Sequence, residues 1–223
     1  MTRELEAEVA VSAQCQLGEG PVWDLDRGLL WWVDLLAGSV HAIDPSTGAR
    51  TRFDAGDAVG AVGLTRGGGL VLALADSFAL AGTDGQDLTR VPGFTIDRTA
   101  IRFNDGKPDP WGNFIAGTMA WDESGNPPGS LYRLAPDGVV TELFGDVGLS
   151  NGLEWNDDQN LFYYSDTNIG RVDVFDTDPD TVAVDVDAAI KAAAAQDDPA
   201  SISGATAGGV RAETAAAESP ACA

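Results

Sequence analysis

The chain has 223 residues, with 13 Lys or Arg against 35 Asp or Glu, and its formal net charge is -22. This charge argues against nucleic acids and anionic membranes as partners, because both would be repelled. The two cysteines, Cys15 and Cys222, indicate no disulfide framework, and no apolar run approaches the ~20 residues that span a bilayer. Since residues 1–6 also lack the apolar core of a signal peptide, we expect a soluble cytoplasmic protein.

Short apolar runs separated by turn-forming residues make up most of the chain. These runs are too short for buried helices and are flanked by Gly, Asp and Asn, which predicts β-strands. The clearest examples are residues 29–33, 70–74 and 161–164, with turn sequences at 44–48 and 136–138. No helical periodicity is evident through residue 176, so we expect an all-β fold.

The sequence also repeats in units of about 40–50 residues, a length typical of β-propeller blades. The units begin near four positions: Glu19, Gly60, Asn104 and Asn151. A shift of 132 positions brings residues 20–23 onto 152–155. A β-sandwich would also give many strands, but not a unit recurring at this length. We therefore predict that residues 1–176 form a partial propeller of about four blades.

The composition changes after Phe175, where aromatic residues end and alanine dominates. Residues 185–196 could form a short helix. The remainder, 197–223, is rich in Ala, Gly, Ser and Thr, which is typical of disorder. We expect residues 177–223 to be a divergent tail, partly helical or disordered.

Three segments place a carboxylate or carboxamide beside glycine at the start of a unit, where propeller strands leave the central channel. They are residues 17–23, 102–113 with 116–119, and 149–155. Together they resemble the gluconolactonase/regucalcin-like family, which includes senescence marker protein and luciferin-regenerating enzyme, over residues 15–176. The resemblance implies a six-bladed propeller that holds one divalent cation in its channel and hydrolyses sugar lactones to aldonic acids.

The resemblance also implies residue roles. Glu19 and Asn151 match two metal ligands, whereas Arg102, Asn104 and Asp122 match substrate-contacting residues. Oxygen ligands suit a hard divalent cation, but they do not distinguish Ca²⁺, Mg²⁺, Mn²⁺ or Zn²⁺. The family's third ligand, an Asp proposed as the catalytic acid/base, has no matching motif here, so the catalytic residue is unassigned.

Structural and functional alternatives stay open. Glu19, Asn104 and Asn151 could each be turn residues, and Arg102 could pair with a surface acid. His41, the one histidine, falls on an expected outer strand, which argues against a histidine triad or a His-rich zinc site. The alternatives to a lactonase are an inactive propeller remnant that lacks the third ligand, or a protein-binding propeller scaffold.

Overall fold

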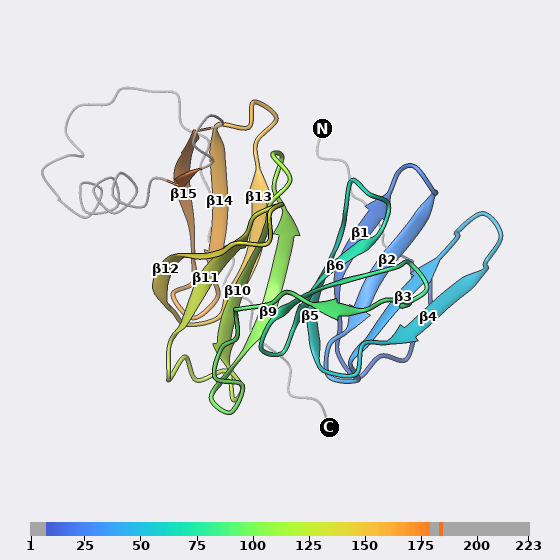
Figure 1. The fold of residues 1–223 in the computed structure, drawn as a ribbon, viewed down its shortest axis with the longest axis horizontal. Helices are drawn as coiled ribbons and strands as arrows, with labels where there is room; N and C mark the ends of the chain where they lie inside the picture. Colours follow the sequence, from blue (N-terminus) through green and yellow to red (C-terminus); the bar gives the residue numbers. More distant parts are fainter. Residues whose placement is uncertain (1–7, 179–182, 185–223) are drawn as a thin grey trace, which may run out of the picture. The chain divides into compact units, whose positions relative to one another are not determined.

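The computed structural model describes residues 8–178 and 183–184. Their sixteen strands form four four-stranded antiparallel sheets, each built from strands that are consecutive in the chain. These sheets are the four blades of a β-propeller, which confirms the expected fold (Figure 1). The described residues include no helix long and apolar enough to cross a membrane.

Each blade is a meander in which neighbouring strands pair in chain order. The first contains β1 (Gly18–Asp24), β2 (Leu29–Asp34), β3 (Ser39–Ile43) and β4 (Arg50–Asp54). The second contains β5 (Val59–Leu64), β6 (Leu70–Leu74), β7 (Phe78–Ala81) and β8 (Thr89–Arg90). The third contains β9 (Ile101–Pro108), β10 (Phe114–Ala120), β11 (Gly129–Leu134) and β12 (Val140–Val147). The fourth contains β13 (Ser150–Trp155), β14 (Leu161–Asp166), β15 (Arg171–Asp178) and β16 (Ala183–Val184).

The fourth blade has four strands, like the other three. β15 continues to Asp178, and its end pairs with β16 through Thr177 and Val184. The expected helix at 185–196 and the expected disorder at 197–223 fall outside the described residues.

Three hydrophobic clusters lie between successive blades. The strand β6 shows why its sequence is an unbroken apolar run. Leu70, Leu72 and Leu74 pack in the cluster shared with the first blade, whereas Val71 and Ala73 pack in the cluster shared with the third. Side chains alternate between the two faces of a strand, so a strand covered on both sides is apolar throughout.

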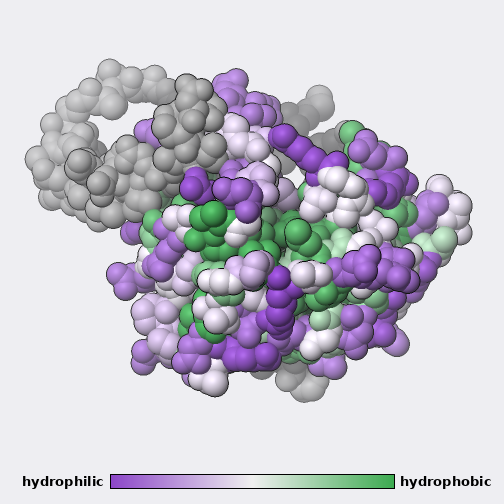
Figure 2. All heavy atoms as spheres, in the orientation of Figure 1, coloured by the Kyte–Doolittle hydropathy of each residue, from purple (hydrophilic) through white to green (hydrophobic). Residues whose placement is uncertain are grey.

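The inner strands bring the expected site residues together. β1 contacts β5, β5 contacts β9, and β9 contacts β13. The inner strands of the four blades therefore lie in sequence around the region where the site is expected (Figure 1). Polar side chains cover much of the visible face, with hydrophobic patches near its middle (Figure 2).

Candidate functional site

All four inner strands carry a β-bulge at corresponding positions. The register with the second strand of the blade shifts after Glu19 in β1, around Gly60 in β5, at 104–105 in β9 and after Asn151 in β13. A bulge breaks the regular alternation and re-aims the side chains beside it. The site residues expected from the repeat thus lie at equivalent irregularities of the four blades.

Gly60 occupies this position in the second blade and allows β9 to approach closely. A Cβ atom on Gly60 would lie 2.2 Å from the carbonyl oxygen of Asn104 and 2.8 Å from that of Phe103. Any side chain here would push β9 away. The glycine therefore sets how near Asn104 comes to the first two blades.

Three of the expected residues form a hydrogen-bonded chain across β9 and β13. Nη1 of Arg102 donates to Oδ1 of Asn104 at 2.6 Å. Nδ2 of Asn104 donates to Oδ1 of Asn151 at 3.0 Å and to the carbonyl oxygen of Ser150 at 2.8 Å. Asn151 in turn donates from Nδ2 to Thr167 Oγ1 at 2.9 Å. Arg102, Asn104 and Asn151 are therefore one connected unit.

Glu19 and Asp105 add two carboxylates that disfavour each other's charge. Desolvation raises the pKa of the exposed Glu19, the neighbouring Asp105 raises it further, and Arg102 partly opposes both. In the described part of the chain, the Glu19 carboxylate accepts no hydrogen bond. A second negative charge near a carboxylate that has no hydrogen-bond donor disfavours its ionised form, and a bound cation would relieve this effect.

Asp105 is a residue that sequence reasoning passed over, although it stands inside the Asn-Asp-Gly run that drew attention to Asn104. Burial raises the pKa of its carboxyl, and the backbone N–H groups of Gly106 and Gly152 only partly offset this. Each of these N–H groups donates to Asp105 at 2.8 Å. The second bond ties β9 to the bulge that carries Asn151.

Arg102 is 4% exposed, and burial lowers the pKa of its guanidinium, while the carboxylates of Glu123 and Glu19 raise it. Its guanidinium carbon lies 5.5 Å from the centre of the Trp121 ring. Such a cation–π contact holds a buried guanidinium in place. Arg102 therefore presents a fixed positive charge at the edge of the site.

Asp122 stands apart from this unit. It is exposed, and the hydroxyl and backbone N–H of Ser124 lower the pKa of its carboxyl. Within the described residues it makes no hydrogen bond to Arg102 or Asn104. On this turn it is the adjacent Glu123, not Asp122, whose charge raises the pKa of Arg102.

The gathered groups fit a hard divalent cation. Glu19 and Asp105 offer carboxylate oxygens, and Asn104 and Asn151 offer carboxamide oxygens. Ca²⁺, Mg²⁺ and Mn²⁺ prefer such oxygen ligands. The electrostatic coupling of Glu19 to Asp105 is the feature of this structure that a bound cation would relieve.

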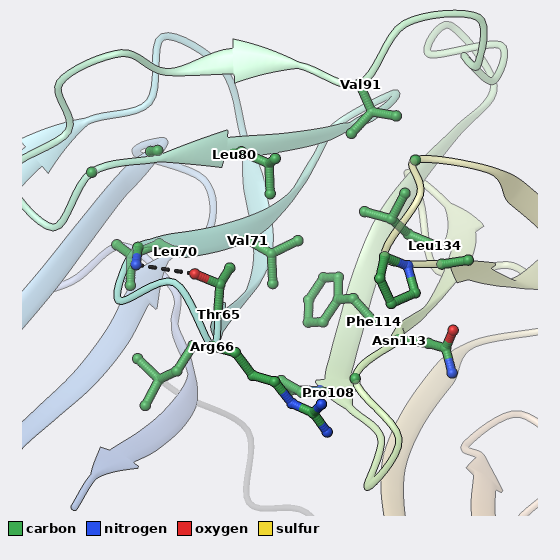
Figure 3. A pocket seen from close by; sticks show the side chains of 18 of the residues that line it. Thr65, Arg66, Leu70, Val71, Leu80, Val91, Pro108, Asn113, Phe114 and Leu134 are labelled. Atoms are coloured by element: carbon green, nitrogen blue, oxygen red, sulfur yellow. Dashed lines mark hydrogen bonds between the residues drawn. The ribbon is translucent and has the colours of Figure 1, made fainter. Parts of the chain in front are cut away.

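A separate apolar cavity of about 500 Å³ lies between the second and third blades. Figure 3 shows its hydrophobic side chains converging from both blades, among them Val71, Leu80, Phe114 and Leu134. None of the residues expected in the site lines it. Its apolar walls do not suit a polyhydroxylated sugar, so the cluster at the bulges is the better candidate for polar chemistry.

Comparisons with known proteins find similarity over most of this chain. The family described as "SMP-30/Gluconolactonase/LRE-like region" matches residues 17–206. Regucalcin from Xenopus laevis is 37% identical over 183 residues, covering 79% of this chain and 60% of that protein. The 6-deoxy-6-sulfogluconolactonase of Pseudomonas putida is 37% identical over 151 residues, covering 68% of this chain and 52% of that protein.

Solved structures of similar proteins show the same architecture. A luciferin-regenerating enzyme superposes with a TM-score of 0.70 at 31% identity, over 79% of this chain and 61% of that one. A calcium-binding protein, regucalcin from Agrobacterium tumefaciens, gives 0.71 at 26% identity, over 79% and 59%. The chain spans between about half and three fifths of the length of these curated relatives and solved structures.

Proposed function

Because this chain belongs to the SMP-30/gluconolactonase/LRE-like family, we propose that it serves in the hydrolysis of a sugar lactone to its aldonic acid with the help of one divalent cation. Lactone hydrolysis is supported by the 6-deoxy-6-sulfogluconolactonase among its relatives. The cation is supported by the neighbouring structure described as a calcium-binding protein.

The proposed cation ligands are Glu19 and Asn151, with Asp105 beside them. The observation that carries this proposal is the Glu19 carboxylate, which accepts no hydrogen bond among the described residues and whose pKa is raised by desolvation and then by the nearby Asp105. When bound, a divalent cation supplies Lewis acidity to a carbonyl group or a water molecule.

The side chains around the cation would orient the lactone. Arg102 is a buried cation held by its bonds to Asn104 and Phe103, so it can donate to the carbonyl oxygen or to ring hydroxyls. The Asn104 carboxamide oxygen, which accepts the Arg102 hydrogen bond, keeps a second lone pair that can accept from a sugar hydroxyl. Asp122, on the exposed turn after β10, is proposed as a weaker contact with sugar hydroxyls. Fixing the substrate in a reactive orientation lowers the entropic part of the barrier.

The test is the rate of acid release from gluconolactone by the full chain, measured against the spontaneous rate. The protein is stripped with a chelator and then supplied separately with Ca²⁺, Mg²⁺, Mn²⁺ or Zn²⁺. We expect acceleration with at least one ion, and its loss in Glu19→Gln but not in the matched variant Glu142→Gln, which changes an exposed acid on β12.

Two other outcomes would replace the proposal. Neither cation binding nor acceleration by the folded chain would favour an inactive propeller remnant that lacks the third ligand. A protein-binding scaffold would be favoured if Glu19→Gln had no effect on function.

A further inference from the structure

A second group of metal-binding side chains lies on the first blade. Ligand atoms of Cys15, Asp34 and His41 all lie within 4.8 Å of one another. They come from three places: the segment before β1, the end of β2 and the middle of β3. No local sequence pattern identifies this group, because antiparallel pairing, not proximity along the chain, brings the three residues together.

Two of the three side chains are already held in place. The Asp34 carboxylate accepts the backbone N–H of Gln16 at 3.0 Å and that of Leu17 at 3.1 Å. Nε2 of His41 lies 2.9 Å from the hydroxyl of Ser39, and its ring stacks on Trp32 with centroids 5.2 Å apart. In protein metal sites, the side chains that bind the metal are oriented by hydrogen bonds from neighbouring groups.

Comparison with the fourth blade shows which part of this arrangement both blades share. There Asp166 accepts the N–H groups of Gly148 at 2.8 Å and Leu149 at 2.9 Å, as Asp34 does in the first blade. The positions that correspond to Cys15 and His41 are Val147 and Asp173. The hydrogen-bonded aspartate therefore belongs to the blade, whereas the thiol and the imidazole are additions that the fourth blade does not share.

We propose that Cys15, Asp34 and His41 bind a thiophilic divalent cation such as Zn²⁺, at a site separate from the one proposed at Glu19. Thiolate, imidazole and carboxylate are the usual ligands of Zn²⁺, and bond lengths of about 2.0–2.3 Å place tetrahedral ligand atoms roughly 3–4 Å apart. Closing the present group to that geometry needs a shift of about 1 Å. Cys15 is half-buried in a segment without regular structure, so it is the residue that moves.

The site is accessible and has a structural consequence. A cavity of about 390 Å³, whose lining includes Cys15, Trp32 and Glu19, gives an ion a path from solvent to the Cys15 thiol. Binding would fasten the segment before β1 to β2 and β3. Three protein ligands would leave one tetrahedral position for water.

Co²⁺ titration of the full chain under reducing conditions tests the proposal, because a thiolate bound to Co²⁺ gives a charge-transfer absorption band in the near ultraviolet. We expect the band in the wild-type chain and in Cys222→Ser, and its loss in Cys15→Ser. His41→Gln should weaken Co²⁺ binding about tenfold or more. Glu19→Gln should leave the band unchanged, which separates this site from the proposed lactonase site.

A second measurement needs no variant: Zn²⁺ should slow the modification of Cys15 by a thiol reagent, read by mass spectrometry of the labelled peptide. The proposal is overturned if saturating Co²⁺ gives no band in the wild-type chain, if the band persists in Cys15→Ser, or if Zn²⁺ leaves the labelling rate of Cys15 unchanged.

Discussion

Asp34 and Asp166 occupy the same place in the first and fourth blades and accept the same backbone hydrogen bonds. The equivalence extends to the main chain: the N–H of Leu35 donates to the carbonyl of Leu17 at 2.8 Å, and the N–H of Thr167 donates to that of Leu149 at 3.0 Å. The sequence repeat is thus a repeat of hydrogen-bonded structure. It also means that equivalent residues lie on equivalent faces of their blades.

Equivalent residues of the first and fourth blades do not pack against equivalent neighbours. We therefore expect Trp155→Ala and Trp23→Ala to lower the free energy of unfolding by different amounts. Trp155 is 9% exposed and stacks on Phe162, with ring centroids 4.6 Å apart, in the cluster between the third and fourth blades. Trp23, its counterpart, is 51% exposed. Urea unfolding should show a loss of about 3–5 kcal/mol for Trp155→Ala and about 1 kcal/mol or less for Trp23→Ala. Equal losses would contradict this assignment of faces.

Substitution of Gly60 should disturb both stability and the candidate site. The new methyl group of Gly60→Ala would meet the carbonyl of Asn104, and such overpacking costs about 1–3 kcal/mol. Gly67→Ala is the control, because the nearest atom to its added Cβ is 3.9 Å away. The free energy of unfolding should change by about 0.5 kcal/mol or less in the control. A Gly60→Ala chain with wild-type stability would show that β5 and β9 are not closely packed there.

Acid should destabilise the fold through Asp24. Burial opposes its ionisation, but donation from the Arg27 side chain and backbone outweighs burial and lowers its pKa. Its contribution is therefore fully present above the unfolded pKa of about 3.9 and is lost as the pH falls through the lower folded value. Asp24→Asn should reduce the difference in unfolding free energy between about pH 7 and about pH 3.

Arg27→Gln is the matched comparison for this prediction. It keeps the carboxylate and the backbone donor but removes the guanidinium at 2.9 Å. We expect a smaller reduction of the same pH-dependent difference. If both variants kept the wild-type difference in unfolding free energy between the two pH values, Asp24 would not contribute to the destabilisation by acid.

Asp105→Asn should weaken divalent-cation binding about tenfold or more, because the carboxylate both adds negative charge near Glu19 and holds Gly152, the residue after Asn151. Calorimetric titration with Ca²⁺ or Mn²⁺ measures this effect. Asp122→Asn, which removes an exposed charge on a turn, is the control and should leave affinity within about twofold. Equal affinity of Asp105→Asn and the wild-type chain would exclude Asp105 from the site.

The sequence was sufficient for the blades and for much of the candidate site. Local patterns predicted these features: short strands separated by recurrent turns predicted the blades, and the repeated glycine beside Glu19 and Asn151 predicted the site positions. It was not sufficient for Asp105, because the partner of this carboxylate is a backbone N–H on another blade. The exposure of Trp23 depends on which faces have a neighbouring blade, and no local pattern encodes that.

We propose Glu19 as a ligand of a divalent cation at the bulges of the inner strands. The most direct measurement is calorimetric titration of the full chain with Ca²⁺, Mg²⁺ and Mn²⁺, repeated on Glu19→Gln and Glu142→Gln. We expect one oxygen-liganded cation per chain. The wild-type protein and Glu142→Gln should bind it equally well, and Glu19→Gln should bind it at least about tenfold more weakly. Unchanged affinity in Glu19→Gln, or no binding of any of these ions by the folded wild-type chain, would contradict it.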